Sequence, residues 1–316
     1  MNRRFLRYAW FVLAYNVGVI LWGAFVRATG SGAGCGEHWP LCNGVVMPRS
    51  PELATVIELT HRLTSGLAGV FVIVLVIAAF RVFPKGHVVR RSAVWSLALT
   101  LTEGLLGAGL VLWGHVAKNA SVWRGVSLTV HLVNTLFLLA ALACTAWFAH
   151  RVAREWGKAA AARSPLVVAA TGLLFVGITG AIAALGDTLF RSESLAEGLA
   201  RDFSPSAHIF LRLRILHPIA AVLMGVYLAV MSARVLAGAR EGTVLRRLGG
   251  VLLALTGLQL ALGALNLVLL APVWMQILHL FAADAVWLSF VLLCAETWHP
   301  GVQSFSVKDV PAVARG

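Results

Sequence analysis

The stretch ELTHRLTSGLAGVFVIVLV, residues 58–76, decides the fold. It opens on three ionisable side chains, Glu58, His61 and Arg62, and residues 63–80 then contain no Asp, Glu, Lys or Arg. A run of this length is about what an α-helix needs to cross a hydrocarbon core of ~30 Å. The stretch therefore predicts a membrane-spanning helix with an ionisable cluster near one end.

The same apolar pattern recurs along the whole chain. It is 59% hydrophobic and 12% charged, whereas soluble domains are about half apolar and a quarter charged. Further uncharged or nearly uncharged runs occupy residues 8–26, 93–113, 126–149, 165–186, 215–233, 248–276 and 273–294. Because backbone in lipid must satisfy its own hydrogen bonds, each run predicts a helix. The fold class expected is an all-α integral membrane protein with eight transmembrane helices.

The net charge of +13 has two possible causes, an anionic partner such as nucleic acid or the orientation of a membrane protein. Most of the 26 Lys and Arg residues fall in the two termini and the even-numbered loops, which share one side of an eight-span chain. By the positive-inside rule, both termini are cytoplasmic. We therefore expect a protein of the cell (inner) membrane in contact with the lipid bilayer and no nucleic acid.

An internal repeat relates the two halves of the chain. The opening stretch resembles RILHPIAAVLMGVYLAV, residues 214–230, with His61 and His217 in register. The segments 103–112 and 130–142 likewise resemble 259–269 and 278–293. The repeat predicts two pseudo-repeated four-helix bundles, the N-terminal one in residues 1–150 and the C-terminal one in residues 165–316. A basic cytoplasmic linker, residues 151–164, joins them.

Four histidines lie inside predicted spans: His61, His131, His217 and His279. A helical histidine is often an ordinary core residue, but ionisable residues inside membranes are rare and point to function. Each lies early in an even-numbered span, which places all four in the outer half of the membrane. Two histidines on facing helices of a bundle are natural axial ligands for a heme iron. We expect one heme between the first two histidines and another between the last two.

The repeat also shows where the halves differ. Glu58 aligns with Arg214, and each stands three residues before its histidine. An arginine there suits a heme propionate, with Arg212 assisting from the adjacent loop. A carboxylate would repel a propionate and instead suits an acid, a base or a cation stabiliser, unless it only pairs with Arg62 at the helix start. The asymmetry predicts one heme kept as cofactor and one that undergoes chemistry.

Two carboxylates in other spans have open roles. Glu103, which aligns with Gln259, fits either a structural hydrogen bond or a proton path. Asp284, five residues after His279, fits a hydrogen bond within its bundle.

The outer loops contain two candidate lids. Cys35 and Cys42 lie in the first outer loop, where disulfides persist, so a disulfide is the first expectation. A redox-cycling thiol pair and a metal site are the alternatives, although Cys-x6-Cys is a weak zinc spacing. Ser194 and Glu197 have capping-box spacing and predict a short amphipathic helix over the second bundle.

These residues together resemble the heme A synthase family. The resemblance rests on RATGSGAGCGEHWPLC, ELTHR, EGLLGA, RLRILHP and the histidines of the fourth and eighth spans, and it covers nearly the whole chain. It implies an oxidoreductase that converts the C8 methyl group of heme O to the formyl group of heme A by successive hydroxylations, for use by terminal oxidases.

The resemblance also implies roles for single residues. His217 and His279 would ligate a resident heme b, and His61 and His131 would ligate the iron of heme O or heme A. Glu58 would stabilise a developing cation at the oxidised carbon. Candidate partners are heme O synthase, terminal oxidase assembly factors and an unidentified electron acceptor.

Two other functions compete with this interpretation. A di-heme cytochrome b would transfer electrons from quinol to a partner, but its hemes usually stack across the membrane rather than lie at one depth. A transporter would also show repeats, but transporters favour helices broken at the midplane.

Overall fold

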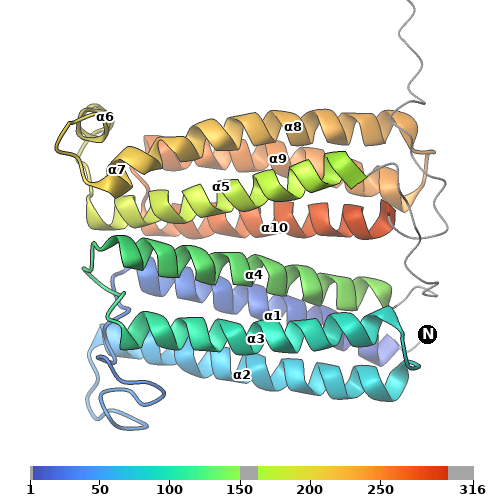
Figure 1. The fold of residues 1–316 in the computed structure, drawn as a ribbon, viewed down its shortest axis with the longest axis horizontal. Coiled ribbons are helices and arrows are strands. Elements are labelled where there is room, and N and C mark those ends of the chain that lie inside the picture. The colour runs from blue at the N-terminus through green and yellow to red at the C-terminus, as the bar shows by residue number, and fades with distance from the viewer. Residues whose placement is uncertain (1–2, 150–162, 298–316) are drawn as a thin grey trace, which may run out of the picture.

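The computed structural model describes residues 3–149 and 163–297, where helices joined by loops form the fold and no strand is present (Figure 1). The helices are α1 (Arg3–Ala28), α2 (Leu53–Val82), α3 (Val88–Leu112), α4 (Val122–Phe148), α5 (Arg163–Leu189), α6 (Leu195–Asp202), α7 (Ile209–Arg214), α8 (Leu216–Gly238), α9 (Val244–Val268) and α10 (Val273–Thr297). Eight segments are long and apolar enough to cross a membrane, α7 and α8 counting as one. The prediction of eight spanning helices is confirmed.

The long helices form two groups of four, α1–α4 and α5 with α8–α10 (Figure 1). The groups meet where α4 contacts α5 and α10, and where α1 contacts α10. Across this contact the Trp287 indole Nε1 donates a 2.7 Å hydrogen bond to the Leu136 carbonyl. Nearly all of the predicted linker, residues 151–164, lies outside the described residues. The repeat symmetry between the groups stays a prediction.

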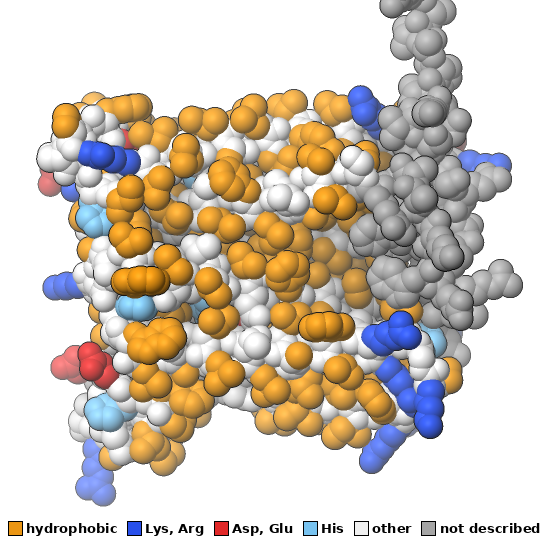
Figure 2. Space-filling model, in the orientation of Figure 1, with side chains coloured by type: hydrophobic (Ala, Val, Ile, Leu, Met, Phe, Trp, Pro, Cys, Tyr) orange, Lys and Arg blue, Asp and Glu red, His pale blue; other side chains and the backbone are white. Residues whose placement is uncertain are grey.

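The surface of the helices is apolar, and fully buried small residues occur where the helices pack against one another. Leu105 and Leu223, both in mid-helix, are each 69% exposed, while Ala9, Ala93 and Ala143 are fully buried. Figure 2 shows hydrophobic side chains covering the middle of the molecule and Lys and Arg concentrated at its two ends. Small residues let membrane helices approach closely while large apolar ones face lipid. The chain is therefore a multi-pass membrane protein.

One predicted boundary was wrong. The uncharged run 248–276 is not one helix, because α9 ends at Val268 and a tight turn precedes α10. Leu270 and Ala271 have φ of 58° and 52° in this turn. The turn ends at Pro272, whose ring suits the start of a helix but not its interior. Hydropathy alone does not detect a turn made of apolar residues.

The sixth span begins earlier than predicted and is broken. Helix α7 starts at Ile209, six residues before the predicted span 215–233, and α8 starts after a break at Ile215. Pro218 has no N–H to donate to the carbonyl of Arg214, so a continuous helix would lose a hydrogen bond here. The break lies directly beside the histidine of this span.

Candidate functional site

The four histidines lie near the same end of the helices, each within the first ten residues of its span. The imidazole rings of His217 and His279 have centroids 6.4 Å apart and planes at 84°. Two imidazoles on opposite sides of one metal, with bonds of about 2 Å and nitrogens about 1.2 Å from each centroid, need roughly this separation. His61 and His131 are close enough for their charges to interact. The separation is compatible with two ligands to one metal in the second group, and the first pair lies within range of a charge–charge interaction.

A glycine on the neighbouring helix faces each histidine. A Cβ atom added to Gly23, Gly107, Gly180 or Gly263 would lie 2.8, 4.0, 2.9 or 3.1 Å from Cε1 of His61, His131, His217 or His279 respectively. Real Cβ atoms essentially never come within 3.0 Å of another heavy atom, so at Gly23 and Gly180 a side chain would displace the ring. These glycines let the helix backbone serve as a flat support for the imidazole.

The turns of α2, α4, α8 and α10 that carry the histidines contain few buried residues. No described residue is buried between Glu58 and Ala68 in α2, between Gly125 and Thr135 in α4, before Gly225 in α8, or between Met275 and Ala282 in α10. Towards the other end of the same helices buried residues recur at nearly every turn. On these four helices the turns that carry the histidines are less buried than the chain on either side of them, which is where a large flat ligand such as a porphyrin would need room.

The histidines differ in what orients them. His131 Nδ1 lies 3.2 Å from Glu103 Oε1, within ion-pair distance but without the alignment of a hydrogen bond, and the same carboxylate accepts hydrogen bonds from Asn134 and Thr135. His217 Nδ1 lies 3.3 Å from the Thr179 hydroxyl, which already donates to the backbone. A partner on Nδ1 fixes the ring and leaves Nε2 for a metal. An anionic partner at His131 makes that imidazole the stronger donor.

His279 is held differently, through Nε2. This nitrogen lies 3.3 Å from the Gln259 amide nitrogen, while Nδ1 has no hydrogen-bond partner among the described residues. Iron coordination at Nε2 of His279 requires this contact to be broken. Nδ1 of His61 is likewise buried without a described partner. Each of these rings leaves a buried nitrogen without a described partner, which is costly unless a ligand uses it, and imidazole is a donor that suits heme iron.

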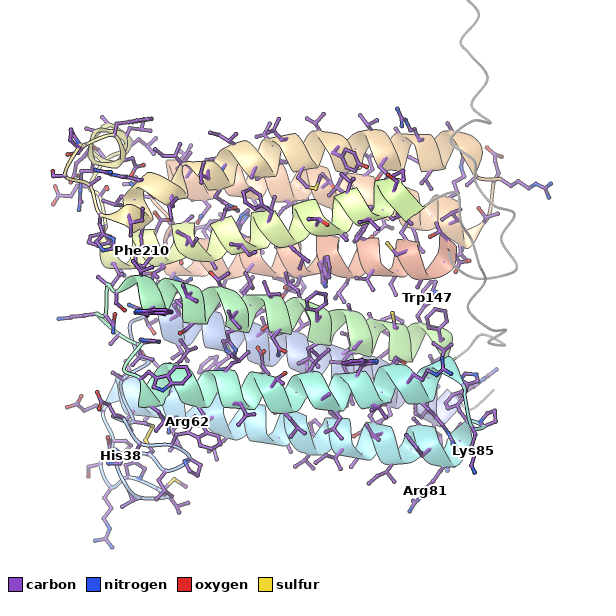
Figure 3. All side chains as sticks on the ribbon, viewed as in Figure 1. His38, Arg62, Arg81, Lys85, Trp147 and Phe210 are labelled. Carbon is purple, nitrogen blue, oxygen red and sulfur yellow. A yellow bond between two sulfur atoms is a disulfide. The ribbon has the colours of Figure 1, made fainter. Side chains whose placement is uncertain are left out.

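Glu58 is buried and faces the first outer loop. Its Oε2 accepts from the Cys35 backbone N–H at 2.8 Å, and its Oε1 pairs with Arg62 at 2.5 Å. Arg62 in turn donates to the carbonyls of His38 and Leu41, at 2.7 and 2.9 Å. Figure 3 shows Arg62 and His38 together at this end of the molecule. The pairing with Arg62 is present, and it connects the carboxylate to the lid.

The lid itself is closed by a Cys35–Cys42 disulfide, the first of the expected alternatives. It packs tightly on the start of α2, where the Gly34 carbonyl accepts a 2.7 Å hydrogen bond from the Thr55 hydroxyl. A Cβ at Gly34 would overlap the backbone of Ala54. The loop therefore sits directly over Glu58.

In the second group Arg214, which aligns with Glu58 in the repeat, holds the other lid. Arg214 pairs with Asp187 of α5 at 2.9 Å and with Asp202 of α6 at 2.7 Å. Helix α6 begins as predicted, with the Ser194 hydroxyl accepting from the Glu197 N–H. Exposed Arg212 donates to the Pro205 carbonyl in the α6–α7 loop. Propionate binding by these arginines stays a prediction, and at Arg214 a propionate would compete with two carboxylates.

Several site residues escaped sequence reasoning. Thr179, Asp187 and Asp202 belong to the site because they contact His217 or Arg214 from segments distant in the chain, and the sequence has no local signal for such contacts. Gly23 and Gly180 could have been found from the internal repeat. They align with each other at nearly the same offset as His61 and His217, the histidines that they face.

Fold and site together define a multi-pass helical membrane protein with a close pair of histidines in each of two four-helix groups. The chain belongs to the COX15-CtaA family of cytochrome oxidase assembly proteins, whose model matches residues 6–291.

Among curated proteins, the chain is 50% identical over 316 residues to a protein of Thermus thermophilus named protoheme IX farnesyltransferase. The match covers 99% of this chain and 52% of that protein, so the chain spans about half the length of this relative. It is also 41% identical over 110 residues to proteins of Bacillus mycoides and Bacillus cereus named heme A synthase, covering 35% of each chain.

Proposed function

We propose that this protein is a heme A synthase, which oxidises the C8 methyl group of heme O to a formyl group by successive hydroxylations. Two close histidine pairs at one depth, each supported by a facing glycine, are the observation that carries the proposal. The family and the Bacillus relatives support it. A di-heme electron carrier would need the pairs at different depths to move electrons across the membrane.

The residues would divide the work between the two groups. His217 and His279 hold a heme b, which supplies one-electron transfer when bound. His61 and His131 would hold the iron of the substrate, each with its imidazole supported by the glycine of α1 or α3 that faces it. Glu58 lies beneath the disulfide lid, where a carboxylate can accept a proton or stabilise positive charge at the oxidised carbon. The lids limit water access to this end of each group.

The name of the Thermus relatives suggests farnesyl transfer as a second function. Mg²⁺-dependent chemistry on a diphosphate uses carboxylates to hold the metal. The described residues bring together no group of three or more His, Cys, Asp or Glu side chains suited to a metal ion. We therefore assign the farnesyltransferase name to the half of those relatives that this chain does not match.

The deciding experiment is heme extraction from the purified protein, followed by chromatography with mass spectrometry. The host should make heme O and lack a heme A synthase of its own. We expect heme b together with hydroxylated or formyl derivatives of heme O. Heme b alone would favour an electron-transfer cytochrome, and farnesylation of protoheme in a host without heme O synthase would favour the transferase.

We also propose that both termini are cytoplasmic and that the histidines lie in the outer half of the cell membrane. The disulfide lid supports this orientation, because disulfides persist outside the cytoplasm. Heme O synthase and oxidase assembly factors are the partners to test, together with an electron acceptor.

Replacing Gly23 by Ala should weaken heme binding in the first group by about tenfold, because the added methyl displaces the His61 ligand. The measurement is heme titration followed by the low-spin absorbance of bis-histidine ligation. Gly18→Ala on the same helix is the matched control, since a Cβ there meets no atom within 4 Å. Equal affinities in the two variants would contradict a supporting role for Gly23.

Replacing Glu103 by Gln should weaken heme binding at His131 by about 10- to 100-fold, because an amide orients and polarises the imidazole less than a carboxylate. The midpoint potential of the first heme should rise as its ligand becomes a poorer donor. Spectroelectrochemical titration measures both hemes in one sample. A change in the second heme alone would contradict this assignment.

A further inference from the structure

Arg124, in the first turn of α4, is a buried cation without a counter-ion. Only 2% of its surface is exposed. One guanidinium nitrogen donates to the carbonyls of Ala117 and Asn119, at 2.5 and 2.8 Å. Across residues 3–149 and 163–297, Nε has no hydrogen-bond partner and no carboxylate pairs with this arginine. Burying a charge in this way is costly unless an anion compensates it.

The position of Arg124 relates it to the histidine site. It stands seven residues before His131 on one helix, hence on the same face and about 10.5 Å further towards the outer end. Ser127 lies between them on that face, with its hydroxyl 2.8 Å from His115 Nδ1. A polar stripe thus leads from the iron ligand to the guanidinium, over about the distance from a heme iron to a propionate.

A second cation lies near Arg124, and its charge is partly offset by Asp187, which is within range of a charge–charge interaction with it. Arg27, at the end of α1, is close enough for the two guanidinium charges to interact. Its side chain donates hydrogen bonds to neutral acceptors, the Ala184 carbonyl, the Thr188 hydroxyl and the Gln276 amide oxygen. Phe210 of α7 lies against Gly125 in the same region, where the two helix groups meet (Figure 3).

The second group has no such free cation at the aligned place among the residues described. Pro272 aligns with Arg124 at the offset of His131 and His279, and Arg214 is already paired with Asp187 and Asp202. In the first group the residue aligned with Arg214 is Glu58, whose charge would repel a carboxylate. Arg124 is therefore the residue suited to neutralise an anionic ligand there.

We propose that Arg124 binds a propionate carboxylate of the porphyrin held between His61 and His131. The inference rests on the proposed function, because it requires a porphyrin at that site. The ionic bond orients the substrate with its propionates towards the outer end of the group.

The test is a titration of the full chain in detergent with iron protoporphyrin IX and with its dimethyl ester, which lacks the carboxylate charges. Subtracting the signal of the His131→Ala protein isolates binding to the first group. The natural chain should prefer the diacid by about tenfold or more, the effect of one charge-assisted hydrogen bond. Arg124→Gln should lose most of this preference, and Arg124→Lys should keep part of it.

Arg246→Gln is the matched control. Arg246 also lies in the first turn of a helix and donates to two carbonyls, those of Leu236 and Ala239, but at the opposite end of the molecule. It should keep the full preference. Equal weakening of both ligands by Arg124→Gln would make Arg124 a loop-capping residue and overturn the proposal. The proposal is also overturned if the natural chain binds the diacid and the dimethyl ester equally well, whether or not the Arg124→Gln protein folds. No porphyrin binding at all to the first group would overturn the proposed function instead.

Discussion

The Glu58→Gln protein is expected to convert heme O about 10²- to 10⁴-fold more slowly than the natural chain, while keeping its second-group heme. This range is what a positioned proton acceptor contributes to a reaction. The amide retains the shape of the side chain and an oxygen for the Cys35 N–H, but it can neither accept a proton nor stabilise a cation. The measurement is the ratio of formyl heme to heme O extracted from a heme O-producing host.

Glu58 also holds the lid, and the Arg62→Gln protein separates the two roles. Both substitutions break the 2.5 Å ion pair, but only Glu58→Gln removes the carboxylate. A catalytic carboxylate predicts a much smaller loss in Arg62→Gln. Equal losses would reduce Glu58 to a tether for the disulfide loop, and loss of the second-group heme in Glu58→Gln would end the division of labour between the groups.

The His279→Ala protein is expected to lose its second-group heme and with it all formation of formyl heme. Removing one of two axial ligands leaves His217 alone to hold the iron, beside a gap in place of the imidazole. The first group should still bind added heme with a low-spin spectrum, because its two ligands are unchanged. Heme content per chain and product analysis measure both effects.

His87→Ala is the control for this experiment. His87 caps α3 at the opposite end, where its Nδ1 accepts from the Val89 N–H, so its loss should cost about 1 kcal/mol of stability and no heme. Full conversion by His279→Ala would assign the second group a structural role only. Retention of its heme would mean that another residue supplies the sixth ligand.

Sequence reasoning predicted the spans well because lipid imposes a simple rule: a long uncharged run must be a helix. It mislocated two helix boundaries that this rule does not determine. The apolar turn at residues 269–272 has the same hydropathy as a helix, and the start of α7 is polar enough to look like a loop. Both boundaries depend on backbone geometry rather than on transfer energy.

By itself, the sequence determined the class of the protein, the four histidines, the Cys35–Cys42 pair and the contrast between Glu58 and Arg214. These follow from hydrophobicity, repeat register and residue type, which are local properties of the chain. Only the tertiary structure decided that Glu58 binds the disulfide loop, that Arg214 is paired with two carboxylates, and that Arg124 is buried without one among the described residues. Those facts depend on which helices meet and how closely they approach, because the energy of a buried charge is set by neighbours distant in sequence.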